Sequence, residues 1–217
     1  MGKKVHPKSV RLTINENWSG QWFAKINKGG LRKYKKNLEE DSKIRSHLNE
    51  ALRNAALEKV EIKRSPQQLN IVIHTARPGL VIGKNGKDIE KLKKDVSKMI
   101  QSKGGLKIDI EEVRRPETHA RLVARSIAEQ LERRLPYRRV MKKTLEKIML
   151  DKELKGVKIR LAGRLNGADI ARSEKLSKGK IPLQTFKANI DFAQEVARTT
   201  YGSIGIKVWI YKEEVKK

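Results

Sequence analysis

The sequence predicts an α+β protein of two domains, each of which combines helices with a β-sheet. Apolar residues recur at helical spacing in four stretches, 42–58, 87–101, 117–135 and 137–151. They alternate, as in half-buried strands, in five others, 59–64, 69–74, 106–110, 157–161 and 206–210. The sequence Arg114-Arg115-Pro116 falls between the third strand and the third helix, so we place the domain boundary there. The expected organisation is a basic arm at 1–36 and domains at 37–114 and 115–217.

The first domain is predicted from two helical stripes and three short strands. The stripe of the helix at 42–58 consists of Ile44, Leu48, Leu52 and Ala55, and Asp41 or Ser42 is expected to cap its start. The stripe of the helix at 87–101 consists of Ile89, Leu92, Val96 and Ile100. Leu80-Val81-Ile82, just before this helix, is expected to hold a short helix against the sheet.

The N-terminal arm is basic and has little regular pattern. Val10, Leu12 and Ile14 alternate, so a short strand is possible there, and the arm contains three large aromatic residues, Trp18, Trp22 and Phe23. Two interpretations stay open, because such an arm either packs on its own domain or docks on a neighbouring molecule.

The second domain begins with two helices and continues with strands. The inner face of the first helix is predicted to hold Ala120, Val123, Ala124, Ile127, Leu131 and Leu135. Pro136 interrupts the helical pattern, and the second helix is predicted to pack Met141, Leu145 and Ile148. For residues 192–200 the pattern fits a helix as well as a strand.

The charge composition points to a polyanionic partner. The chain has 217 residues, with 51 Lys and Arg against 25 Asp and Glu, which gives a formal net charge of +26. Such an excess costs the folded state self-repulsion unless a polyanion compensates it. Aromatic residues make up only 5% of the chain, so backbone electrostatics rather than base stacking should dominate nucleic-acid binding.

Composition also excludes several classes of function. The chain has no cysteine, which excludes thiolate metal sites, a cysteine nucleophile and a disulfide framework. No apolar run approaches the ~20 residues that span a bilayer. The first residues lack the apolar stretch of a secretory signal. We therefore expect no metal, no cofactor, no small-molecule substrate and no membrane partner.

A glycine-flanked turn, Gly83-Lys84-Asn85-Gly86, lies between two predicted helices. The glycines let the backbone approach a sugar-phosphate chain closely, Lys84 adds charge, and the helix that follows directs amides at the ligand. With the strand order around it, this turn resembles the GxxG loop of a KH domain, which clamps single-stranded nucleic acid. The helix and strand that precede it indicate the type-two arrangement. Arg77 and Lys87 complete the candidate loop site, and the alternative is an ordinary turn between helices.

A second candidate site is a basic helical face. The eleven residues 133–143 contain six cations and no acidic residue, and the cations are Arg133, Arg134, Arg138, Arg139, Lys142 and Lys143. On a helix, the last four share one broad face opposite an apolar stripe. Such a face holds phosphates and carries little sequence information. The alternative is a solvated charged face.

Long motifs in the C-terminal half resemble those of one family, the third protein of the small ribosomal subunit. They are Gly-Arg-Leu-Asn-Gly-Ala-Asp-Ile-Ala-Arg-Ser at 163–173, Ile-Pro-Leu-Gln-Thr-Phe-Lys-Ala-Asn-Ile-Asp at 181–191 and Thr-Thr-Tyr-Gly-Ser-Ile-Gly-Ile-Lys-Val-Trp-Ile at 199–210. Residues 1–7 and 74–83 match as well. The chain departs from the family at Lys175-Leu176, where an aromatic residue is usual, and at Lys187-Ala188-Asn189 in place of Arg-Ala-Asp.

The resemblance implies a type-two KH domain followed by a two-layer α/β domain, two helices on a four-stranded sheet, with residues 187–200 mainly extended. It implies a structural role in the head of the small subunit, bound to small-subunit rRNA, with small-subunit proteins ten and fourteen as neighbours. It also implies a part in the channel through which mRNA enters, where Arg138, Arg139 and Lys142 align with an Arg-Arg-x-x-Lys set attributed to unwinding mRNA. Candidate rRNA contacts are Lys3, Lys4, Arg11, Arg164, Asn166 and Arg172.

Two other functions are alternatives to this one. A free-standing KH regulator is disfavoured by the C-terminal motifs and by the lack of a second GxxG in a KH context. A DNA lyase needs a lysine with a depressed pKa, and among 51 basic residues no lysine stands out as a candidate. A metal nuclease needs converging carboxylates, whereas Glu111 and Glu112 are neighbours on a strand and point to opposite faces. The expected location is the ribosome, in the cytoplasm or in an organellar stroma or matrix.

Overall fold

The computed structural model describes residues 5–24, 27–65, 67–100 and 105–212. It divides into unit 1, which is Met1–Asn17 with Arg115–Lys217, and unit 2, which is Trp18–Arg114. The arm expected at 1–36 is therefore shared between the units, with its described residues 5–17 in unit 1 and those from Trp18 onwards in unit 2.

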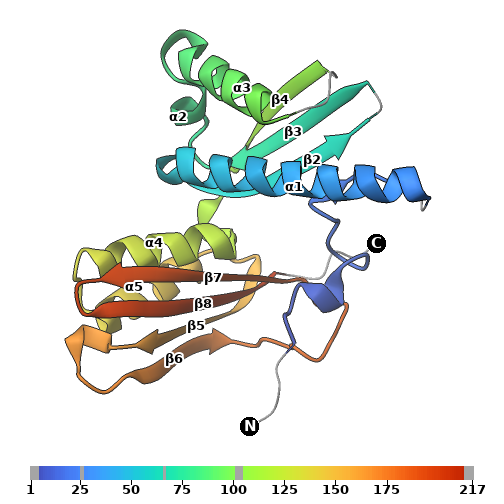
Figure 1. Ribbon diagram of the computed structural model, residues 1–217. Coiled ribbons are helices and arrows are strands. Elements are labelled where there is room, and N and C mark those ends of the chain that lie inside the picture. The colour runs from blue at the N-terminus through green and yellow to red at the C-terminus, as the bar shows by residue number, and fades with distance from the viewer. Residues whose placement is uncertain (1–4, 25–26, 66, 101–104, 213–217) are drawn as a thin grey trace. The chain divides into compact units, whose positions relative to one another are not determined.

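Unit 2 is a four-stranded sheet covered by helices on one face. Its strands are β1 (Gly20–Gln21), β2 (Leu57–Arg64), β3 (Gln68–Thr75) and β4 (Gly105–Glu112), in the order β1-β2-β3-β4. β2 and β3 are antiparallel, whereas β1 runs parallel to β2 and β4 runs parallel to β3. The helices are α1 (Lys28–Ala51), α2 (Pro78–Ile82) and α3 (Lys87–Met99) (Figure 1). The core includes Ile44, Leu48, Ile62, Ile71, Ile73, Leu92 and Val96.

The start of the first helix was predicted wrongly. α1 begins at Lys28 rather than at residue 42, and Asn27 caps it by accepting a hydrogen bond from the backbone NH of Gly30 at 2.6 Å. The apolar pattern marked only the half of α1 that packs on the sheet. The preceding turns are fixed by polar contacts instead, because Glu40 and Asp41 are buried and pair with Arg64 of β2.

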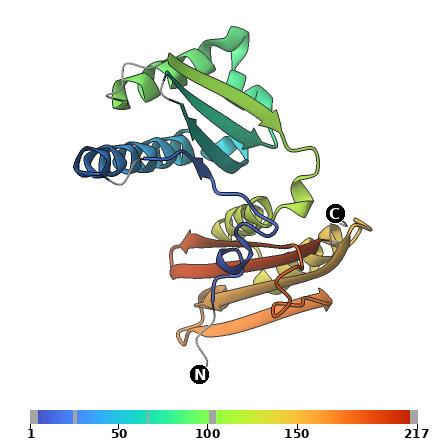
Figure 2. The ribbon, with the colours of Figure 1, turned by 90° about the vertical axis from the view of Figure 1, so that its right-hand side faces the viewer.

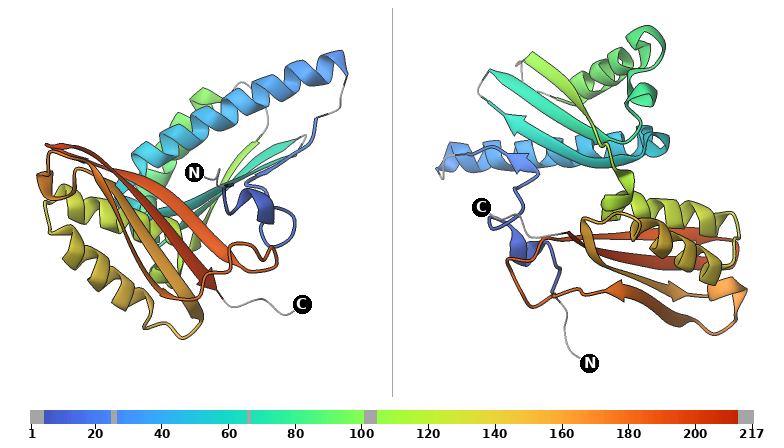
Figure 3. Two further views of the ribbon diagram at one scale, coloured as in Figure 1. Left: turned by 90° about the horizontal axis from the view of Figure 1, so that it is seen from below. Right: turned by 180° about the vertical axis from the view of Figure 1, so that it is seen from behind.

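Unit 1 is an antiparallel sheet with two helices on one face. Its strands are β5 (Leu154–Gly163), β6 (Arg172–Gly179), β7 (Ile190–Thr199) and β8 (Gly202–Lys212), in the order β6-β5-β8-β7. Helices α4 (Ala120–Glu132) and α5 (Tyr137–Ile148) pack on Ile159, Leu161, Ile206 and Val208 (Figure 3). Residues 190–199 form a strand, which decides the alternative that the pattern left open and agrees with the implied fold.

Two details of unit 1 differ from expectation. α4 ends at Glu132, and Leu135 is exposed rather than part of the inner face. The chain turns out of the helix at Arg134, whose φ of 62° lies in the left-handed region typical of the residue after a helix C-terminus. Strand β6 had no sequence signal, because it is a polar edge strand in which only two residues are partly buried.

The N-terminal arm packs on its own domain, which is one of the two interpretations left open. Residues Ser9–Arg11 form a 3-10 turn, so the strand considered for 10–14 is wrong. Lys8 pairs with Asp191 of β7 at 2.7 Å, and the rings of His6 and Phe192 make an edge-to-face contact. Figure 2 shows the arm, in blue, beside the red strands of unit 1. Among the described residues, no helix is both long and apolar enough to cross a membrane.

Candidate nucleic-acid interface

The loop between α2 and α3 has the backbone geometry that its glycines predict. Gly83 has a φ of 72° and Gly86 a φ of 76°, and Asn85 between them also lies in the left-handed region at 56°. A Cβ atom at Gly83 would overlap the side chain of Asp88 in the first turn of α3. Gly83 is therefore required both by its dihedral angles and by the close approach of α3.

The side chains of the loop give it a basic outer surface. Lys84, Asn85 and Lys87 are exposed, as is Arg77 at the start of α2. The backbone NH of Arg77 donates to the hydroxyl of Thr75, which is fully buried and thus fixes where the chain leaves β3. The backbone of the turn and the first amides of α3 are positioned to bind phosphate oxygens, with the lysines supplying charge.

The sequence predicts that the three apolar residues before the loop pack against the sheet, but only one of them is buried. Val81 is fully buried, whereas Leu80 is 56% exposed and Ile82 is 42% exposed. α2 has only five residues, so a single turn cannot direct three consecutive side chains inward. Leu80 and Ile82 instead offer apolar surface on the element that leads into the glycine turn.

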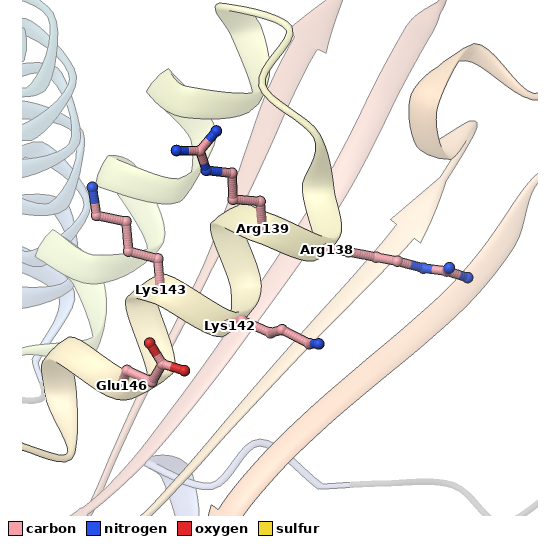
Figure 4. Close-up of a pocket in the computed structure, with 5 residues that line it drawn as sticks. All are labelled: Arg138, Arg139, Lys142, Lys143 and Glu146. Carbon is pink, nitrogen blue, oxygen red and sulfur yellow. The ribbon is translucent and has the colours of Figure 1, made fainter.

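The basic face of α5 forms as predicted. Val140, Met141, Leu145 and Ile148 are buried, and a shallow hollow on the outer side is lined by Arg138, Arg139, Lys142, Lys143 and Glu146. Figure 4 shows Arg138 and Lys142 extending to one side of the helix, and Arg139 and Lys143 to the other. Arg133 and Arg134 are exposed in the turn before α5 and do not line the hollow.

Arg138 differs from the other cations because an acidic residue from β6 holds it. The Nε of Arg138 donates to the hydroxyl oxygen of Tyr137 at 3.1 Å, and that hydroxyl donates to Glu174 at 2.7 Å. The hydrogen bond from Tyr137 and the charge of Arg138 lower the pKa of Glu174, although partial desolvation opposes them. The hydrogen bond to Tyr137, helped by Glu174, raises the pKa of Arg138. Sequence reasoning missed Glu174, which is 36 positions away from Arg138.

The candidate rRNA contacts divide into three groups. Lys3 and Lys4 lie outside the described residues. Asn166 and Arg172 are exposed on the surface of unit 1. Arg164 is partly exposed and organises its own loop, since its guanidinium donates to the carbonyl oxygens of Ala168 and Tyr201 and pairs with Asp169.

Arg11 does not lie on the surface as an rRNA contact would require, because the structure buries its side chain. Its side chain is only 1% exposed, and its guanidinium donates to four backbone carbonyl oxygens, those of Pro7, Leu183, Thr185 and Ala188. These bonds tie the N-terminal arm to the segment before β7. Arg11 therefore has a structural role, and the positive charge that suggested an RNA contact is used inside unit 1.

The described residues contain no cluster of three or more His, Asp or Glu side chains that could hold a metal ion. Glu111 and Glu112 lie next to each other at the end of β4, so the strand directs them to opposite faces. Chemically, the two candidate sites can provide charge and hydrogen-bond donors to a polyanion.

Comparisons with known proteins agree with this arrangement. Residues 43–118 match the family described as "KH domain", and residues 127–210 match the family described as "Ribosomal protein S3, C-terminal domain". The two matches fall on the glycine loop with its sheet and on the domain that contains α5.

Similar proteins cover almost the whole chain. Proteins named "Small ribosomal subunit protein uS3" are 48% identical in Pseudoalteromonas atlantica and 50% identical in Xanthomonas oryzae pv. oryzae, over 99% of this chain and 89% and 85% of theirs. The protein of that name from Clostridium novyi is 46% identical over 99% of this chain and 94% of its own. This chain, with its type-two KH domain and its two-layer C-terminal domain, belongs to the uS3 family of small ribosomal subunit proteins, a family of structural components rather than enzymes.

Proposed function

We propose that this protein is a structural constituent of the head of the small ribosomal subunit. In this role it binds small-subunit rRNA, and the basic face of α5 contributes to the channel through which mRNA enters. One observation supports the role in the mRNA channel. The outer side of α5, opposite its buried apolar stripe, carries four exposed cations, Arg138, Arg139, Lys142 and Lys143.

The KH loop supplies the rRNA contact in this proposal. Gly83 and Gly86 bring the backbone close to a sugar-phosphate chain, and Lys84 and Lys87 neutralise its charge. If the protein works within the ribosome of a bacterial-type cytoplasm, nearly all of it should sediment with small subunits and whole ribosomes on a density gradient. Protein that stays at the top of a low-salt gradient would favour a free RNA-binding regulator.

The face of α5 grips the mRNA backbone and helps to melt its structure. Changing Arg138, Arg139 and Lys142 together to Gln should slow translation through a stable mRNA hairpin several-fold and affect unstructured mRNA little, because each lost phosphate contact weakens the grip. The ratio of the two translation rates, measured with purified components, is the relevant quantity.

The matched control is Lys147→Gln, which removes a cation from the same helix but from a side chain that pairs with Glu117 at 3.0 Å and does not line the hollow. It should leave the ratio unchanged. Among single variants, Arg139→Gln and Lys142→Gln should have larger effects than Arg138→Gln, since Glu174 already offsets part of the charge of Arg138. If the triple variant has the same ratio as the unaltered protein, the mRNA role is wrong.

Small-subunit proteins ten and fourteen are the proposed protein neighbours. The first half of α1 offers a surface for such a contact, because Leu31, Tyr34 and Leu38 are exposed and lie at helical spacing on one face. A photo-reactive group at Tyr34 in assembled subunits should crosslink to one of the two proteins, and crosslinks to rRNA alone would argue against this surface.

A further inference from the structure

The sheet of unit 1 has a second face, opposite α4 and α5, that carries a row of cations. Residues paired across neighbouring strands share a face. In the strand register Lys175 lies opposite Arg160, Arg160 opposite Lys207, and Lys207 opposite Gln194. The row therefore crosses all four strands and has a cation on three of them. The residues that alternate with them, such as Ile159 and Val208, are buried under the helices. Figure 1 shows this face toward the viewer, with no helix across it.

The neighbouring row on this face is flat. It consists of Ser173, Ala162, Gly205 and Val196, which have small or short side chains. A Cβ atom at Gly205 would meet only the carbonyl oxygen of Ala162, at an ordinary contact distance of 3.7 Å. Packing within unit 1 therefore does not require glycine at this position. The row on the other side holds Lys158, Trp209 and Phe192, where the N-terminal arm covers the end of the sheet.

No acidic residue of the four strands lies on this face. Glu174, Asp191 and Glu195 are the acidic residues of β5–β8, and each pairs with a helix-facing residue, Leu161, Ile210 and Ile206 respectively. The cations of the face are Lys158, Arg160, Lys175, Arg198 and Lys207. Within the described part of the chain, no salt bridge joins Lys175 or Lys207 to an acidic side chain.

We propose that this face, defined by Arg160, Lys175, Lys207 and the flat row beside them, binds the backbone of double-helical RNA. Neighbouring strands are about 4.8 Å apart, so the three cations span about 10 Å of surface, a short stretch of a phosphate backbone. The flat row lets the backbone approach without a steric barrier. Neither row offers an aromatic ring for stacking an unpaired base, which favours a duplex over a single strand. The proposal rests on the RNA-binding character of the family but not on the mRNA role of α5.

The test is binding of the full chain to a blunt-ended RNA duplex of 20 base pairs, measured by fluorescence anisotropy over a series of salt concentrations. The variant Arg160→Gln/Lys175→Gln/Lys207→Gln should raise the Kd about tenfold or more and reduce the slope of log K against log salt by roughly 2 to 3. The matched control, Lys33→Gln/Lys36→Gln/Lys43→Gln, removes the same charge from exposed positions of α1 and should change both quantities less.

A second variant tests the face without changing charge. Gly205→Leu places a bulky side chain in the flat row, where the fold has room for a Cβ atom, and should weaken duplex binding several-fold while circular dichroism shows an unchanged fold.

Equal weakening by the two triple variants would overturn the proposal, because net charge alone would then explain the binding. The proposal would also be overturned if the variant Arg160→Gln/Lys175→Gln/Lys207→Gln kept its affinity for the duplex but no longer bound an acidic protein of the subunit. Either failure leaves the hairpin experiment on α5 untouched, since α5 lies on the other face of the sheet.

Discussion

The sheets of units 1 and 2 both have four strands and a helical layer on one face, but their other faces differ in charge. In unit 2 the uncovered face carries three lysines, one histidine and three acidic residues. Several of these basic and acidic side chains form close pairs. Lys59 lies 2.8 Å from Glu61, Lys107 lies 3.1 Å from Asp109, and His74 lies 3.3 Å from Glu111. In unit 1 the strands β5–β8 place five cations and no acidic residue on the corresponding face.

This difference shows how strand pairing turns an overall basic composition into distinct surfaces. On the face of unit 2, Lys59, His74 and Lys63 together lower the pKa of Glu61, although burial alone would raise it. The carboxylates of Glu61 and Asp109 on this face are thus paired with lysines of the same unit. On the face of unit 1, Lys175 and Lys207 have no salt bridge to an acidic side chain within the described part of the chain. Their charge costs self-repulsion in the free protein, and this cost is recovered when a polyanion binds.

The largest expected effect is a loss of stability in unit 1 when the N-terminal arm is released. Among the described residues, this arm covers one end of the unit 1 face, and no such arm covers the face of unit 2. Arg11→Ala removes the buried guanidinium and leaves four backbone carbonyl oxygens without their donor. We expect the free energy of unfolding of unit 1 to fall by about 3 kcal/mol or more. Hydrogen exchange of the β7 and β8 amides measures this opening.

The control for Arg11→Ala is Arg172→Ala, an exposed arginine at the start of β6. It should change stability by less than about 0.5 kcal/mol. Similar losses in the two variants would mean that the carbonyl contacts of Arg11 do not anchor the arm.

A smaller effect, on pH dependence, should separate the two uncovered faces. Because the pKa of Glu61 is lowered in the folded protein, its contribution to stability is present above the unfolded value of about 4.3 and is lost as the pH falls through the folded value. Glu61→Gln should therefore cost about 1 kcal/mol at pH 7, and this cost should shrink as the pH falls below the unfolded value. Urea unfolding at a series of pH values measures the difference.

Glu50→Gln, which changes an exposed carboxylate of α1, serves as the reference. The uncovered face of unit 1 has no carboxylate in its strands and should add nothing to the acid dependence. A difference between Glu61→Gln and the unaltered protein that stays constant down to pH 3 would contradict the role of the Lys59–Glu61 pair.

The smallest expected effect is at Gly205 on the face of unit 1. Gly205→Ala should leave stability unchanged or raise it by about 0.5 kcal/mol, because alanine reduces the entropy of the unfolded chain and its Cβ makes only an ordinary contact with the carbonyl oxygen of Ala162. Gly156→Ala, in β5 of the same sheet, gives the contrast, since its added Cβ would overlap the backbone carbonyl of Lys180 and should cost about 2 kcal/mol or more. Thermal unfolding midpoints compare the two, and a destabilised Gly205→Ala would show that the fold itself requires glycine there.

Local pattern predicted the elements whose side chains alternate between a core and solvent. The strands around Val60, Ile71 and Ile108 and the buried stripes of α3 and α5 all appear near the expected positions. Elements without such contrast were missed or misplaced. In the middle of α1 the apolar stripe is interrupted by Glu40 and Asp41, which are buried in pairs with Arg64. β6 is a polar edge strand with almost no apolar contrast between its two faces.

The candidate sites divide in the same way. The glycine loop was predictable because left-handed dihedral angles at Gly83 and Gly86 restrict the residue type locally. The face of α5 was predictable because helical periodicity alone places Arg139 and Lys143 opposite Met141 and Leu145. The burial of Arg11 and the contact of Glu174 with Tyr137 depend on segments far apart in the chain, so no local pattern reports them.

The sequence by itself determined the net charge of +26, the fold class, the glycine turn and the basic stripe of α5. Each of these follows from composition or from the period of a single element. Only the tertiary structure decided which cations are exposed and which are used internally. Asp191, for example, accepts a hydrogen bond from the backbone NH of Ala120 at the start of α4 and pairs with Lys8, from two other parts of the chain. The physical reason is that charge is a property of a residue, whereas its compensation depends on which residues folding brings within a few ångströms.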